Sequence, residues 1–184
     1  MTPLEAELLE IAGSVPDPEM PVLSLRELGV LRSLRAHGPE SVEVELTPTY
    51  TGCPAIEAMA QDIREALGRR GVRDVEVRTV LTPAWSTDDI TPEGRSKLRR
   101  FGIAPPRPSE AHGPVSLRLG ATRRGAVGPS YAEPPETAGR EAPVHCPLCG
   151  SPDTELLSRF SSTACKALRR CRGCREPFDH FKEL

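Results

Sequence analysis

Apolar side chains recur at helical spacing in two segments of the chain. The first segment, residues 3–12, starts directly after Thr2, which forms a capping box with Glu5. The second segment, residues 54–69, carries one continuous apolar stripe. Pro54 stands where proline is common, at the first position of a helix. The pattern therefore predicts a helix over each segment.

Shorter patterns predict two further helical segments in the first hundred residues. A second capping box at residues 24–27 predicts a single helical turn that ends at Gly29. Residues from 91 onward predict a last helix, with Leu98 and Phe101 turned inward.

Alternation of apolar and charged side chains indicates strands. Residues 42–46 alternate cleanly, and residues 75–80 form a similar run. Residues 30–36 precede a turn at 37–40, so the first two strands are expected to form a hairpin. The order α-β-β-α-β-α predicts the α/β class, as a small sandwich with three strands.

Proline and glycine dominate the middle of the chain. Residues 104–143 hold eight prolines and five glycines, with only a weak strand-like alternation at 115–119. A long loop packed on one domain is the alternative, but structureless loops of this length are uncommon in compact domains. The composition favours a domain at 1–103, a mostly extended Pro/Gly-rich linker at 104–143 and a second unit at 144–184.

Four cysteines of the last unit form two C-x-x-C pairs. Cys146 and Cys149 make the first pair, Cys171 and Cys174 the second, and 21 residues separate the pairs. Each pair can supply two of the four ligands of a tetrahedral metal site. A unit of about 40 residues is too small for a stable hydrophobic core and needs a bound metal ion to fold. We predict a zinc ribbon with one structural zinc per chain; two disulfides and a rubredoxin-like iron site are the alternatives. Its strands are expected at residues 156–160 and 178–181.

Composition narrows the class of protein. The 184 residues are 38% hydrophobic and 27% charged, as in soluble globular proteins, and the net charge of −2 argues against a general nucleic-acid binder. No apolar run approaches the roughly 18–20 residues of a membrane span, and the N-terminus has no secretory signal pattern. We expect a cytoplasmic protein, without membrane contact, whose cysteines are thiols or metal ligands.

Basic side chains gather near the second cysteine pair, and they have three interpretations. They can offset the negative charge of a tetrathiolate site, meet an acidic partner or bind nucleic acid, which is the least favoured of the three. The residues are Lys166, Arg169, Arg170, Arg172 and Arg175.

Cys53 is a candidate working thiol outside the ribbon. It follows a predicted strand and begins the helix at 54–69, where free backbone N–H groups and the helix dipole predict a lowered pKa. Gly52 permits close approach of another group, and Thr51 supplies a hydroxyl. Such a thiolate can bind metal or act as a nucleophile; a small buried cap residue is the alternative.

Two carboxylates on a proline-rich loop are candidate partners of this thiol. Asp17 and Glu19 can bind a metal together with Cys53, or they can cap the helical turn at 24–27. His37 is expected at a turn tip, so a Cys–His nucleophile is unsupported and no enzyme activity is predicted. The sixth cysteine, Cys165, is either a spare thiol of the ribbon or part of a partner-facing loop.

Several motifs resemble a known family. The segments 15–22 (VPDPEMPV), 27–29 (ELG) and 47–54 (TPTYTGCP) resemble the iron–sulfur cluster assembly domain of the SufT type. The segments 81–94 (LTPAWSTDDITPEG) and 160–168 (FSSTACKAL) narrow the resemblance to the PaaD family, associated with phenylacetyl-CoA epoxidase.

The resemblance implies an accessory role in aerobic phenylacetate catabolism. In related assembly domains a reactive cysteine at the position of Cys53 is proposed to handle iron or clusters, and Asp17 and Glu19 match their acidic loop. The implied clients are the epoxidase subunits, above all the iron–sulfur flavin reductase, with a general cluster-assembly scaffold as a further partner. One thiolate does not complete a cluster site, so a homodimer is an expectation as well.

Three hypotheses follow. The first is a maturation or targeting factor that binds iron or an iron–sulfur cluster transiently through Cys53. The second is a structural or coupling subunit of the epoxidase complex. The third is a zinc-ribbon regulator that binds nucleic acid.

Overall fold

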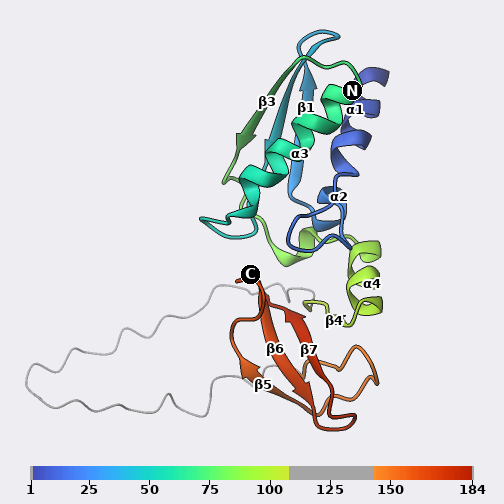
Figure 1. Cartoon of the computed structure of the whole chain (residues 1–184), viewed down its shortest axis with the longest axis vertical. Coiled ribbons are helices and arrows are strands. Elements are labelled where there is room, and N and C mark those ends of the chain that lie inside the picture. The colour runs from blue at the N-terminus through green and yellow to red at the C-terminus, as the bar shows by residue number, and fades with distance from the viewer. Residues whose placement is uncertain (1, 108–142, 184) are drawn as a thin grey trace, which may run out of the picture.

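The structure is a computed structural model that describes residues 2–107 and 143–183. Two small sheets lie one beyond the other along its long axis (Figure 1). The N-terminal part contains α1 (Pro3–Gly13), α2 (Leu25–Leu28), β1 (Leu31–Ala36), β2 (Ser41–Leu46), α3 (Ala55–Arg69), β3 (Asp74–Thr79), the 3-10 turn η1 (Thr87–Asp89) and α4 (Pro92–Arg100).

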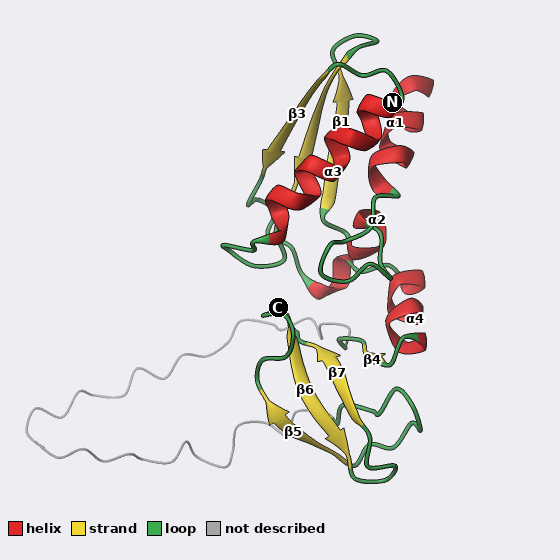
Figure 2. Cartoon of the chain, viewed as in Figure 1, coloured by secondary structure: helices red, strands yellow, loops and turns green. Residues whose placement is uncertain are grey.

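The first sheet has the strand order β1-β2-β3, and helices α1 and α3 cover one face of it (Figure 2). Strands β1 and β2 form the predicted antiparallel hairpin, while β3 runs parallel to β2 after the crossover through α3. Alternate residues of β2, Val42, Val44 and Leu46, are buried against the helices. The predicted α/β sandwich with three strands is confirmed.

Local signals set the helix ends as the sequence predicts. Thr2 and Ser24 each form a complete capping box, with Glu5 and Glu27 respectively. Gly29 ends α2 with a φ of 77°, and a Cβ there would lie 2.3 Å from the backbone oxygen of Asp89, so only glycine fits.

The prediction for Phe101 was wrong. Leu98 is fully buried as expected, whereas Phe101 is 70% exposed. Helix α4 ends at Arg100, so Phe101 is its C-cap and no longer continues the buried stripe of the helix.

The second sheet is the ribbon, with strand order β4-β7-β6-β5. Its strands are β4 (Ile103–Ala104), β5 (Thr154–Ser158), β6 (Lys166–Cys171) and β7 (Pro177–Phe181). Strand β5 lies two residues earlier than predicted, and β6 was not predicted. The boundary drawn after residue 103 falls inside β4, which pairs with β7 in parallel. Most of the proposed linker, including the alternation at 115–119, lies outside the described residues.

The ribbon packs end-on against the N-terminal part. Two of its residues, Cys165 and Phe181, belong to the main hydrophobic core rather than to the ribbon's own small core. The ring of Phe181 lies 6.0 Å from that of Trp85, centroid to centroid. In the described part of the chain, no helix is both long and apolar enough to cross a membrane.

Candidate metal centre and thiol site

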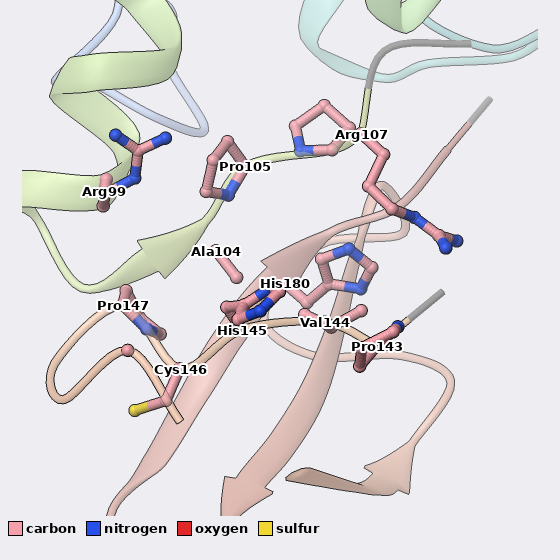
Figure 3. A pocket seen from close by; sticks show the side chains of 12 residues that line it. Arg99, Ala104, Pro105, Arg107, Pro143, Val144, His145, Cys146, Pro147 and His180 are labelled. Atoms are coloured by element: carbon pink, nitrogen blue, oxygen red, sulfur yellow. The ribbon is translucent and has the colours of Figure 1, made fainter. Parts of the chain in front are cut away.

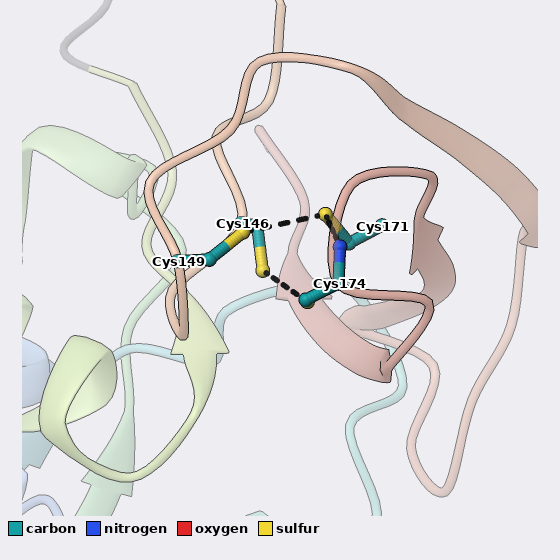
Figure 4. Close-up of side chains that lie close together, drawn as sticks. All are labelled: Cys146, Cys149, Cys171 and Cys174. Carbon is teal, nitrogen blue, oxygen red and sulfur yellow. Dashed lines mark hydrogen bonds between the residues drawn. The ribbon is translucent and has the colours of Figure 1, made fainter.

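The four cysteines of the C-x-x-C pairs meet at one end of the ribbon (Figure 4). Their Sγ atoms all lie within 4.8 Å of one another; the Cys146–Cys174 distance is 3.8 Å and the Cys149–Cys171 distance is 3.5 Å. Sulfurs held tetrahedrally at a zinc–sulfur bond of about 2.3 Å would be about 3.8 Å apart. The set therefore fits a metal ion, and four thiolates are the donors of closed structural zinc sites.

A backbone donor favours the thiolate form in this cluster. The N–H of Cys174 donates to Sγ of Cys171 at 3.4 Å, and this hydrogen bond is the largest of several that lower the pKa of Cys171 to about 6. A backbone hydrogen bond from Glu176 lowers the pKa of Cys174, but burial and hydrogen bonds with the neighbouring thiols raise it to about 12, so the first proton leaves from Cys171. A thiol that loses its proton near neutral pH is the better metal ligand.

A cavity of about 400 Å³ lies beside Cys146 (Figure 3). Arg99 and Pro105 line it from α4 and the segment after β4, and His145 and His180 line it from the ribbon. Both parts of the chain thus build its wall, which follows from the pairing of β4 with β7.

Carboxylates of the ribbon engage much of the basic cluster. Arg170 and Arg172 both pair with Glu155 across strands β5 and β6. The Lys166 ammonium lies 3.4 Å from a carboxylate oxygen of Asp179. These pairings favour charge compensation within the ribbon over a surface of free cations for nucleic acid.

Cys53 lies in the loop between β2 and α3, where the sequence places it. Its backbone N–H donates to the carbonyl of Tyr50 at 3.2 Å, and Pro54, not Cys53, is the N-cap of α3. Thr51 and Gly52 are exposed. A Cβ at Gly52 would meet nothing within 4 Å, so glycine serves the φ of 85° there and not a close approach.

The predicted lowering of the Cys53 pKa was wrong. Burial raises the pKa of this thiol, and the charges of Glu19 and Asp17 raise it further. Hydrogen bonds from the backbone of Ala55 and the side chain of Thr49 act in the opposite direction and are outweighed. The thiol is therefore held mainly protonated until a cation displaces the proton.

The acidic loop faces this thiol, but its two carboxylates differ. Asp17 is 2% exposed and closes its own loop by accepting hydrogen bonds from the N–H groups of Glu19 and Met20. It does not cap α2, which Ser24 and Glu27 cap. Burial raises the pKa of Asp17. Glu19 is half-buried, and its charge acts on the Cys53 thiol.

Cys165 is the site residue that sequence reasoning missed. It lies just before β6, is 3% exposed, and its Sγ is 4.0 Å from Oε2 of Glu19, 146 residues earlier in the chain. The only sequence signal was that Cys165 is neither a ribbon ligand nor part of a C-x-x-C pair. His37, by contrast, lies beside Glu43, as a turn-tip residue.

Two family models match the chain. The model described as iron-sulfur cluster assembly protein matches residues 5–81, and the PaaD zinc beta ribbon domain matches residues 131–182. The first match contains Cys53, and the second contains Cys165 and all four clustered cysteines.

Curated relatives match as well. The chain is 42% identical over 176 residues to a putative subunit of 1,2-phenylacetyl-CoA epoxidase from Escherichia coli K12, covering 96% of this chain and 91% of that protein. It is 27% identical to an Fe-S protein maturation auxiliary factor of Porphyromonas gingivalis, covering 51% of this chain and 90% of the relative.

Two similar solved structures each cover about half of this chain. A Bacillus anthracis domain of unknown function, DUF59, has 24% identity, a TM-score of 0.47 and coverage of 52% of this chain and 91% of that one. A Mycobacterium tuberculosis protein associated with [Fe-S] complex assembly and repair has 31% identity, a TM-score of 0.32 and coverage of 53% and 84%. The near full-length match and the two family models together show that the chain belongs to the PaaD family of 1,2-phenylacetyl-CoA epoxidase subunits.

Proposed function

We propose that this chain is an accessory protein of phenylacetate degradation that helps to mature an iron–sulfur or iron centre of phenylacetyl-CoA epoxidase, with the reductase cluster as its client. The observation that carries the proposal is Cys53, a half-buried thiol inside the assembly-protein match whose pKa is raised by burial and by the charges of Glu19 and Asp17. Iron or a cluster is cargo here, and the chain itself performs no catalytic reaction.

The two parts of the chain have different tasks in this proposal. Cys146, Cys149, Cys171 and Cys174 would hold one structural zinc, because all four donors come from protein and no position stays open. Cys53 would bind the cargo, with the carboxylates of Asp17 and Glu19 beside it. Thr51 and Gly52 shape the exposed loop that carries the thiol.

The names of the relatives support the choice of client. One relative is named as an epoxidase subunit and another as an Fe–S maturation factor, and a maturation factor that serves the epoxidase reconciles both names. A general cluster scaffold would be the source of the cargo.

The test measures the iron–sulfur cluster content of the proposed client, the epoxidase reductase. The epoxidase reductase is produced without this protein, with the wild type and with Cys53→Ser, and iron and sulfide per reductase are determined. We expect full cluster content with the wild type and a several-fold loss in the other two cases. Gln61→Ala, on the exposed face of α3, is the control and should behave as the wild type. Equal content in every case would sink the proposal.

A structural or coupling subunit is the second candidate. Exposed apolar side chains on the ribbon favour it: Phe160 is 64% exposed, and Leu156 and Leu157 are each 48% exposed. This function predicts stoichiometric co-purification with the epoxidase and a reductase cluster content that does not depend on Cys53.

A further inference from the structure

We propose that Cys165 and Cys53 are the two thiolate ligands of one cargo site within a single chain, and that Glu19 supplies a carboxylate oxygen to it. This inference deepens the proposed function and rests on it. The site lies between the N-terminal part and the ribbon, and it would take a thiophilic divalent cation such as Fe²⁺ or an iron–sulfur cluster.

The first step is convergence. Sγ of Cys165 lies 4.0 Å from Oε2 of Glu19, and the charge of Glu19 also acts on the thiol of Cys53. Tyr50 lies near all three groups: burial raises its pKa, and the charges of Cys53, Glu19 and Cys165 raise it further. Two thiols from separate segments therefore lie near the carboxylate of Glu19. Their donor atoms do not all lie within 4.8 Å of one another, as those of the four clustered cysteines do, so a bound cation would have to draw them together.

The second step is that the fold holds Cys165 firmly at this place. Its carbonyl accepts a hydrogen bond from the N–H of Lys182 at 3.0 Å, and its Sγ lies 3.1 Å from the hydroxyl of Thr163. The next residue, Lys166, pairs in register with Phe181, which is fully buried in the main core. The contact that anchors the ribbon thus also positions the thiol.

The third step is charge. Lys166 forms its ion pair with Asp179, and its charge also acts on Asp17 and on the Cys165 thiol, where it partly offsets the rise in pKa that burial causes. Within residues 2–107 and 143–183, Glu19 forms no ion pair with a lysine or arginine. A partly buried carboxylate without an ion-pair partner is costly, and a bound metal ion would offset the charge of Glu19. Binding would release the two thiol protons to solvent.

The donor set selects the cargo and leaves room for transfer. Thiolates favour Fe²⁺, Zn²⁺ or iron–sulfur clusters over Mg²⁺ and Ca²⁺, which prefer oxygen. Three protein donors leave a tetrahedral position open, as in sites that exchange a ligand. Cys53 is half-buried while Cys165 is buried, so hand-over to a client would proceed on the Cys53 side. A second chain is then not needed to supply the second thiolate.

The experiment uses the full chain with zinc in the ribbon, titrated anaerobically with Co²⁺ as a spectroscopic probe. We expect one further Co²⁺ per chain, with thiolate-to-cobalt charge-transfer absorption. Cys53→Ser and Cys165→Ala should each weaken binding at least tenfold and about halve that absorption, because one thiolate remains. Ser162→Ala, in the same loop as Cys165 but exposed, is the matched control and should bind as the wild type does.

Zinc content and Trp85 fluorescence show whether each variant keeps its fold. If Cys165→Ala loses either property, Glu19→Gln replaces it as the deciding variant, because Glu19 is only half-buried and glutamine keeps the size of its side chain. Wild-type binding in the deciding variant, or no Co²⁺ uptake by the wild type beyond zinc, would overturn the inference. A reductase that needs Cys53 but not Cys165 would overturn this site alone, whereas Co²⁺ uptake without any effect on the reductase would overturn the proposed function alone.

Discussion

Replacing Phe181 with alanine should undock the ribbon from the N-terminal part. Phe181 ends β7, is fully buried, and packs at 48° against the ring of Trp85. Trp85 is itself 6% exposed, and its Nε1–H donates to the carbonyl of Leu28 at 2.9 Å. The pair therefore joins the end of the chain to the core around α2.

The expected cost follows from this burial. Removing a fully buried phenylalanine side chain costs about 3–5 kcal/mol, of which the aromatic pair supplies about 0.5–1.5 kcal/mol. Because the ring of this β7 residue packs into the main core and not into the ribbon's own small core, its loss should weaken the contact between the two sheets. The two sheets should keep their own hydrogen bonds in Phe181→Ala, while the Cys165 thiol becomes accessible.

The assay uses the fluorescence of Trp85, which lies where the ribbon meets the N-terminal part. Trp85 is the only tryptophan of the chain, so its emission reports on this contact alone. We expect a red-shifted native emission in Phe181→Ala, a lower urea midpoint and a Cys165 that reacts with a thiol reagent. Phe178→Ala is the control, because Phe178 is 4% exposed in the ribbon's own small core; it should weaken zinc retention with less effect on native Trp85 emission.

A small effect would refute the reasoning. If Phe181→Ala lowers the free energy of unfolding by less than about 1 kcal/mol and leaves Trp85 emission unchanged, the interface contributes nothing to stability. The ribbon would then be a tethered unit, and the cargo site inferred above would lose its positioning contact.

Three further predictions test single features. Burial raises the pKa of Asp17, so the stability that this carboxyl group contributes is present at low pH and is lost as the pH rises through its folded-state pKa. In urea titrations at several pH values, Asp17→Asn, which keeps the acceptor oxygen, should reduce this pH dependence, whereas Asp17→Ala should lower the free energy of unfolding by about 1–3 kcal/mol at every pH. Gly29→Ala should lower the melting temperature far more than Gly52→Ala, because both need a positive φ, worth about 1–2 kcal/mol, but only Gly29 also meets backbone at 2.3 Å. Chelation of zinc under reducing conditions should unfold the ribbon while far-ultraviolet circular dichroism retains the helices of the N-terminal part, and a full helical signal loss would contradict this.

Features that depend on neighbouring residues could be predicted from the sequence. The capping boxes at Thr2 and Ser24, the αL end at Gly29 and the helix after Pro54 all involve partners within a few positions. The cysteine pairs were equally local, since each C-x-x-C turn is a unit, and only the meeting of the two pairs needed the fold.

Features that depend on residues far apart in the sequence could not be predicted from it. The sign of the Cys53 pKa shift depends on burial and on Glu19, which lies on another loop, and these outweigh the helix terminus that the sequence made visible. Strand β6 was missed because its basic residues show no apolar alternation; the partners of Arg170 and Lys166 are Glu155 on β5 and Asp179 on β7. The place of Cys165 depends on a contact across 146 residues.

Strand β6 explains why a metal-stapled ribbon would accompany a cargo-binding thiol. Its last residue, Cys171, is one of the four clustered cysteines, and the residue just before it begins is Cys165. A ribbon this small has too little core to hold a strand without the metal, so the zinc would fix β6, and β6 would fix the second cargo thiol. The order of events follows: zinc must be bound before the thiols of Cys53 and Cys165 can act together, and zinc loss should abolish cargo binding even though no zinc ligand touches the cargo.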